Sequence, residues 1–211
     1  MAAILQFPGA ASAMNTTLQR AIVLSLLALL MAATRSHVFT HFTPVPDASW
    51  AVFLIGGFYL RDWARWAFPA LMALAVAIDW MVIRSQGMDF FAHYCVSPGY
   101  WMLVPAHAAM WAGGHWLRRH YTGASLGALA RLAAAVVVAT ATCHLFAQGG
   151  FYWLSSAVAE PTVAGWAANY GHWFGPYLAA TTMFVAVAAV AQAVSEVVVR
   201  HAGPARQRKR G

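Results

Sequence analysis

The chain has 211 residues, of which 61% are hydrophobic and only 9% are charged. Soluble domains carry about 25% charged residues, so a water-soluble fold of this length could not cover so much apolar surface. A bilayer solvates such a surface, and each spanning helix needs about 20 apolar residues. The composition therefore predicts an all-α integral membrane protein, with a single transmembrane domain over residues 1–211.

The chain has a net charge of +7, and its basic residues are distributed in the way that is typical of membrane proteins. Most basic residues lie between hydrophobic runs or in a tail over residues 200–211, which contains Arg200, Arg206, Arg208, Lys209 and Arg210. Basic residues in such positions bind anionic lipid headgroups on the cytoplasmic side. We therefore expect the lipid bilayer, and not nucleic acid, as the partner of these charges, with residues 200–211 as a basic cytoplasmic tail.

Six apolar runs predict six transmembrane helices. In chain order they cover residues 18–34, 49–60, 66–83, 101–117, 126–154 and 171–199. The first run has features of a secretory signal, but we expect it to be retained as a helix. Its small residues, including Ala28 and Ala32, recur every three or four positions, which favours close helix packing. The alternative is that alanine is simply common in this chain.

The basic residues also predict the orientation. With the amino terminus in the cytoplasm, the outer side holds only Arg35 and Arg84, and the inner side holds the tail residues together with Arg20, Arg61, Arg65, Arg118, Arg119 and Arg131. Short cytoplasmic loops carry an excess of Lys and Arg. We expect a multi-pass protein of the bacterial inner membrane with both termini in the cytoplasm.

This orientation gathers reactive side chains on the outer side. The candidate ligand-binding residues there are His37, His41, Asp79, Cys95, Tyr100, Trp101, Tyr152 and Trp173. An aromatic pocket with a few polar groups is typical of a site for a large, partly apolar ligand. The alternative is an interfacial belt, because Trp and Tyr concentrate at membrane interfaces in any case.

Two of these residues carry particular chemistry. Asp79 is a carboxylate in an apolar helix, which is energetically expensive and favours a functional role, although its position near the helix end could let it reach water. Cys95 lies in the second outer loop, whereas the other cysteine, Cys143, lies within the fifth helix, so no disulfide is expected. A thiolate is a good ligand for soft or borderline metals, and simple packing is the alternative.

Six helices, internal termini and an outer pocket resemble the substrate-binding S-components of energy-coupling factor (ECF) vitamin transporters. Residues 90–100, with the sequence FFAHYCVSPGY, are similar to a loop of the BtuM group, which are S-component-like proteins of Gram-negative bacteria associated with vitamin B12 uptake. The Ala28 and Ala32 face is similar to the surface by which S-components dock on a coupling subunit. BtuM-like proteins often work without a dedicated coupling module, so both modes stay open.

The resemblance implies that the chain takes up cobalamin or cobinamide from the periplasm. Cys95 would ligate the corrinoid cobalt, and could assist the reductive removal of cyanide from cyanocobalamin. Asp79 and Tyr100 would line the pocket, with His37 or His41 as the nearest imidazole. The chain is then primarily a transporter, and enzymatic decyanation stays open.

Two other functions remain as alternatives. One is an S-component for another vitamin or a metal ion, in which Cys95 is incidental. The other is a haem-binding redox protein that uses His107, His144 and His172, since imidazoles on separate helices can ligate one haem. Of these three, only His107 and His144 are expected at a common depth. No His-Glu-x-x-His helix or Walker A sequence is present in the chain.

Overall fold

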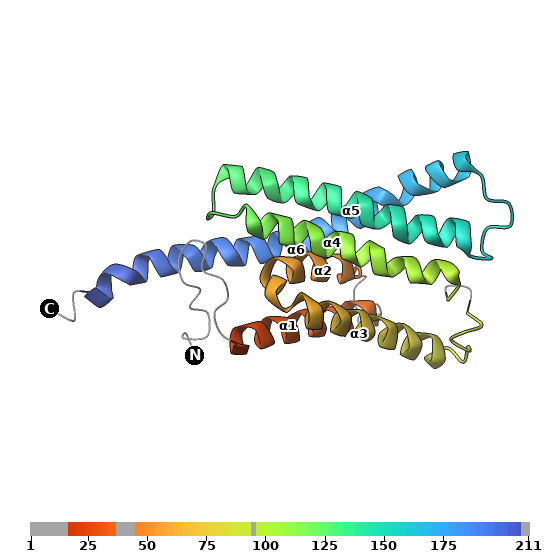
Figure 1. The fold of residues 1–211 in the computed structure, drawn as a ribbon, viewed down its shortest axis with the longest axis horizontal. Coiled ribbons are helices and arrows are strands. Elements are labelled where there is room, and N and C mark those ends of the chain that lie inside the picture. Colours follow the sequence, from red (N-terminus) through yellow and green to blue (C-terminus); the bar gives the residue numbers. More distant parts are fainter. Residues whose placement is uncertain (1–16, 37–44, 94–95, 208–211) are drawn as a thin grey trace.

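The computed structural model describes residues 17–36, 45–93 and 96–207, and all regular elements within them are helices (Figure 1). The main helices are α1 (Thr17–Arg35), α2 (Ser49–Tyr59), α3 (Ala64–Ser85), α4 (Leu103–Arg119), α5 (Leu126–Leu154) and α6 (Val163–Gln207), and two short 3-10 helices are η1 (Arg61–Trp63) and η2 (Pro98–Met102). Each predicted apolar run forms a helix. The largest difference is that α6 covers 163–207 rather than 171–199, so it is longer at both ends.

Four segments are long and apolar enough to cross a membrane: Thr17–Arg35, Arg61–Ser85, Leu126–Leu154 and Val163–His201. The predicted class of all-α membrane protein is therefore supported. By contrast, α2 has 11 residues, which correspond to about 16 Å, roughly half the hydrocarbon thickness. Six full spans and cytoplasmic termini stay predictions.

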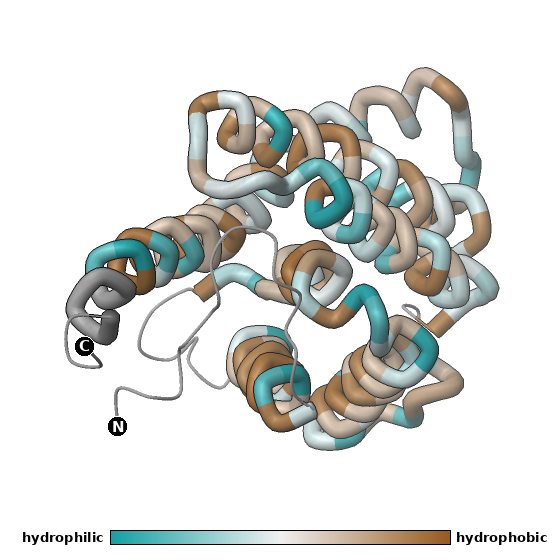
Figure 2. The backbone as a smooth tube through the Cα atoms, turned by 60° about the vertical axis from the view of Figure 1, so that its left-hand side comes forward, coloured by the Kyte–Doolittle hydropathy of each residue, from teal (hydrophilic) through white to brown (hydrophobic). Residues whose placement is uncertain are grey.

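The helices form two groups with α2 between them (Figure 1). Helices α4 and α5 lie together on one side of α2, and α1 and α3 lie on the other, while α6 packs against α5 and α2. Ten of the 11 residues of α2 are buried. The outer faces of the other helices carry large exposed hydrophobic side chains, such as Leu29, Val138 and Val187, and brown segments run along the helices in Figure 2. A surface of this kind requires lipid.

Glycines allow α2 and α4 to approach backbone to backbone. A methyl group on Gly57 would overlap the carbonyl group of Trp111, and one on Gly114 would overlap the carbonyl group of Leu54. Small residues at such positions are typical of helix packing in membranes, where van der Waals contact replaces the hydrophobic effect. Helix α2 is therefore fixed chiefly against α4.

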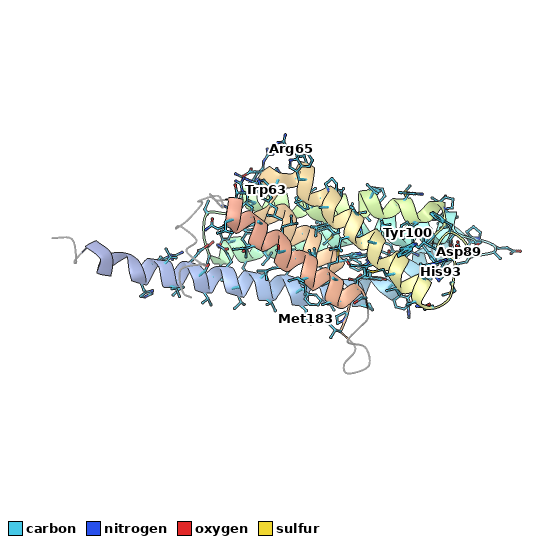
Figure 3. The ribbon with its side chains drawn as sticks, turned by 90° about the horizontal axis from the view of Figure 1, so that it is seen from below. Trp63, Arg65, Asp89, His93, Tyr100 and Met183 are labelled. Carbon is cyan, nitrogen blue, oxygen red and sulfur yellow. The ribbon has the colours of Figure 1, made fainter. Side chains whose placement is uncertain are left out.

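The bundle has two polar ends, which we name after the carboxylate found at each. At the Asp79 end, α1, α3 and α5 finish and α2 and α4 begin. At the Glu196 end, α2 and α4 finish and α5 begins, and α6 extends past it. In Figure 3, Asp89, His93 and Tyr100 lie near one end of the bundle, and Trp63 and Arg65 lie near the other.

Candidate functional site

Asp79 forms a two-point ion pair with Arg35. The Nε atom of Arg35 lies 2.7 Å from Oδ1 of Asp79, and its Nη2 atom lies 2.7 Å from Oδ2. Both side chains are largely buried, with 15% of Arg35 and 18% of Asp79 exposed. Parallel N–H···O bonds of this kind are strong and directional. The pair joins the last turn of α1 to α3, and it neutralises the carboxylate that the sequence singled out.

Tyr100 completes this cluster from a third element. Its hydroxyl donates a hydrogen bond of 2.6 Å to Oδ2 of Asp79. Tyr100 lies in η2, which follows the loop between α3 and α4, and its ring packs edge-on against Phe90 of that loop, with 6.2 Å between centroids. Two of the candidate ligand-binding residues, Asp79 and Tyr100, are thus in direct contact. We call Arg35, Asp79 and Tyr100 the Asp79 cluster.

A further carboxylate holds the other side of the Arg35 guanidinium. Nη1 of Arg35 lies 3.1 Å from Oδ2 of Asp47 and donates a bond of 3.2 Å to the Ser49 hydroxyl. Oδ1 of Asp47 accepts bonds from the backbone N–H and the hydroxyl of Ser49, at 2.9 and 2.7 Å, and so caps the start of α2. Four elements thus meet at one arginine. In the sequence analysis, Arg35 served only to predict the orientation of the chain in the membrane.

The remaining described candidates are aromatic residues in different surroundings. Trp101 is 68% exposed, and its ring lies 6.4 Å from that of Tyr100 between centroids. Trp173 is 47% exposed, as expected of an aromatic at a membrane interface. Tyr152 is buried, and its hydroxyl accepts a bond of 3.3 Å from the backbone N–H of Thr162 in the α5–α6 connection. The outer pocket made of these aromatics together with Asp79 stays a prediction.

Three predicted residues, His37, His41 and Cys95, lie outside the described part of the chain. The structure describes the loop up to His93 and again from Val96. His93 accepts a backbone bond of 2.8 Å from the N–H of Val96. Gly99 packs so closely on Gly150 of α5 that a side chain there would overlap its carbonyl group. The segment after Cys95 is thus fixed on α5 beside the Asp79 cluster.

Ala28 and Ala32, the predicted docking residues, are half-buried and pack against the core of this chain. Part of the small-residue face of α1 therefore serves internal packing. Leu26 and Leu29, which are 60% and 67% exposed, provide more accessible surface on the same helix.

The sequence analysis did not anticipate a groove at the Glu196 end. It encloses about 730 Å³ of space open to the surroundings, and its lining is almost entirely apolar. The lining comes from the end of α2, from α4, from the first turns of α5 and from the middle of α6, and includes Phe58, Leu129, Leu132, Val185 and Ala189. A groove at the end opposite to Asp79 was not predicted.

Glu196 organises the polar groups beside this groove. Its carboxylate is 6% exposed and accepts bonds from the Tyr121 hydroxyl at 2.5 Å, the Ala124 N–H at 3.0 Å and the Gln192 amide at 2.9 Å. Arg200 lies 3.2 Å away. Burial and the bond to Glu196 raise the pKa of Tyr121. A carboxylate in the apolar α6 was the available sequence signal, by the same reasoning that selected Asp79.

The three histidines of the haem alternative are placed very differently. His107 and His144 are each 1% exposed, whereas His172 is exposed beside Trp173. His107 packs on Phe53 at 4.3 Å, and His144 packs near Trp50 at 5.9 Å, measured between ring centroids. Side chains of α2 thus lie against both buried imidazoles. Within the described residues, no group of three or more potential metal-ligating side chains converges.

The fold and site define an all-helical protein with four helices able to cross a membrane and a buried ionic cluster at one end. A scan against protein-family models and a search of the curated proteins found no match to this chain.

Proposed function

We propose that the chain is a membrane uptake protein that binds cobalamin or a related corrinoid on the periplasmic side and passes it inward. The observation that supports this most directly is the bond between Tyr100 and Asp79. These two residues were expected to share one site because of the resemblance of residues 90–100 to the BtuM group. They meet where the loop that carries Cys95 joins η2.

The chemistry required of Cys95 is a ligand exchange at cobalt. The thiolate donates an electron pair to the metal, and a weaker axial ligand such as water departs with the pair it had donated. Cobalt keeps its oxidation state in this exchange, so no electron donor is needed. Soft thiolate ligands suit such a centre. Reductive decyanation would be a separate step with an external donor.

The Asp79 cluster would set the wall of this site. Arg35 and Tyr100 both bond to Asp79, so side chains from two other elements hold this carboxylate in position. A fixed polar group beside an apolar aromatic surface is typical of sites that orient a large ligand. The distribution of basic residues predicts that the Asp79 end lies in the periplasm.

The visible absorption spectrum of protein incubated with cyanocobalamin and freed of unbound ligand tests the proposal. We expect the wild type to retain a corrinoid with a red-shifted spectrum, and Cys95→Ala to lose that shift. Cys143→Ala is the matched control, because Cys143 is the other cysteine and lies buried in α5. It should keep the wild-type spectrum.

A colourless wild-type protein would exclude corrinoids and favour an S-component for another vitamin. Equal spectra for wild type and Cys95→Ala would remove the cobalt–sulfur contact. A Soret band in protein purified without corrinoid would instead favour the haem alternative.

A further inference from the structure

Helix α5 carries three buried polar side chains in succession, on adjacent turns. Thr140, His144 and Gln148 are 0%, 1% and 9% exposed. Oγ1 of Thr140, Nδ1 of His144 and both amide atoms of Gln148 are buried without a hydrogen-bond partner. Residues four apart on a helix form one ridge. This polar ridge is distinct from the Asp79 cluster.

The polar ridge faces α2 and α6. The His144 ring lies 4.5 Å from the ring of Tyr170 and 5.4 Å from that of Tyr177, and Trp50 of α2 stacks on Tyr177 at 4.5 Å. On α6, Nε1 of Trp166 is also buried and unpartnered. We call this junction of α5 with α2 and α6 the α5 seam.

The unpartnered atoms include both donors and acceptors. Nε2 of His144 lies 3.1 Å from the carbonyl oxygen of Tyr170. Because a carbonyl only accepts, Nε2 carries a proton, and Nδ1 of the neutral ring is an acceptor. The Gln148 amide offers one of each kind, and Trp166 offers a donor. Water, which both donates and accepts, matches this set.

Leaving the polar side chains of the α5 seam without hydrogen-bond partners is energetically unfavourable. Each buried polar group without a partner costs about 1–3 kcal/mol, and the bilayer interior supplies no water to such groups. Native structures contain few of them. Four unpartnered side chains at one junction therefore favour a second arrangement in which water reaches them.

The α5 ridge continues toward the Glu196 end as an apolar surface. Val136, one turn before Thr140, is 4% exposed, and the next two residues of the ridge, Leu132 and Ala128, line the groove. The ridge is thus polar toward the Asp79 end and apolar toward the groove, with Val136 at the boundary.

We propose that the α5 seam is a water-accessible pathway in a second, open conformation, which extends from the Asp79 end to Thr140 and is closed by Val136. This pathway would be the route of the uptake proposed above. It rests on that proposed function only for the identity of the solute that passes along it. It predicts access for small polar solutes from one side of the membrane.

Cysteine labelling tests the pathway without any corrinoid. In membrane vesicles, and in a Cys95→Ala, Cys143→Ala background, we would add a small, charged, membrane-impermeant thiol reagent to Thr140→Cys and Gln148→Cys. Val136→Cys is the control on the same ridge, and Val138→Cys is the control on the face exposed to lipid. We expect labelling at 140 and 148 to be at least tenfold faster than at either control.

Equal labelling rates at 136 and 140 would overturn the proposal, as would labelling at 148 no faster than at 138. The result is independent of the proposed function. A protein that binds no corrinoid can still be labelled at positions 140 and 148. A protein that binds corrinoid through Cys95 can still resist labelling at these positions.

A second measurement avoids substitutions altogether. Hydroxyl radicals generated from water modify side chains beside that water. Trp50 of the wild type, which is 9% exposed and stacks on Tyr177 in the seam, should therefore be modified at least fivefold faster than Trp111. Trp111 is the matched control, because it is 8% exposed and packs on Phe68. Equal rates for the two tryptophans would contradict an open seam.

Discussion

At the residue scale, one arginine determines how the Asp79 end is assembled. Arg35 contacts two carboxylates from different elements, Asp79 on α3 and Asp47 before α2. Removing one partner of a largely buried pair leaves a charge without compensation, which is far more costly than removing an exposed pair. The chain contains both kinds of pair, and the exposed one joins Arg20 to Asp62.

The substitution Asp79→Asn is therefore expected to lower the free energy of unfolding by about 3 kcal/mol. Thermal unfolding in detergent would measure the change. The matched control is Asp62→Asn, whose carboxylate is 46% exposed and whose loss should change stability by less than about 1 kcal/mol. Similar melting temperatures for the two variants would show that the Arg35–Asp79 pair contributes little to the fold.

Sequence reasoning singled out residues that carry a strong energetic signal, but it did not identify the residues that they contact. Asp79 was selected because a carboxylate in an apolar run is energetically costly. Tyr100 was selected because the loop that precedes it resembles a loop of the BtuM group. Nothing in the spacing of Arg35 or Asp47 indicates that they meet Asp79, since that contact depends on how α1, α2 and α3 pack. Thr140 and Gln148 passed unnoticed because a polar residue is common in a membrane helix.

At the element scale, α2 and α4 form the closest pair in the bundle, and glycine makes this approach possible. Gly57 and Gly114 each lie where an added methyl group would meet backbone atoms of the partner helix, which cannot move aside as a side chain can. Helix boundaries were predictable from hydrophobic runs. The α2–α4 contact was not, because glycines were abundant and gave no indication of their partners.

Gly114→Ala is expected to destabilise the protein by about 2 kcal/mol or more, because overpacking forces two backbones apart. Gly171→Ala is the control. It lies on α6 with nothing within 4 Å of an added methyl group, and should be neutral or stabilising by up to about 1 kcal/mol through helix propensity. Denaturation curves that ranked the two variants in the opposite order would contradict the close approach.

At the scale of the whole molecule, the two ends differ in chemistry. The Asp79 end has a saturated ionic cluster, whereas the Glu196 end combines an apolar groove with a carboxylate that receives four polar groups. The predicted ligand pocket was assigned to the first end from residue types alone. The groove at the second end is lined by residues of α2, α4, α5 and α6, and how these helices pack together is not encoded in composition.

The predicted orientation can be measured with reporter fusions. Alkaline phosphatase, which is active only in the periplasm, should be active when fused after Gly87 and inactive when fused after Gly123, both of which lie in connections between helices. A fluorescent protein at the carboxyl terminus should be bright, because it folds in the cytoplasm. The reverse pattern would place the Asp79 end inside and move the proposed ligand site to the cytoplasm.

The burial of α2 has a consequence for how the chain enters the membrane during synthesis. Ten of the 11 residues of this helix are covered by protein, so the helix is surrounded by other helices rather than by lipid. It is also too short to cross the bilayer on its own. We expect the insertion machinery to release α1 and α3 into lipid first. Helix α2 would then reach its final place only after α4 has been synthesised, so that nascent chains ending before Leu103 should leave it accessible to proteases.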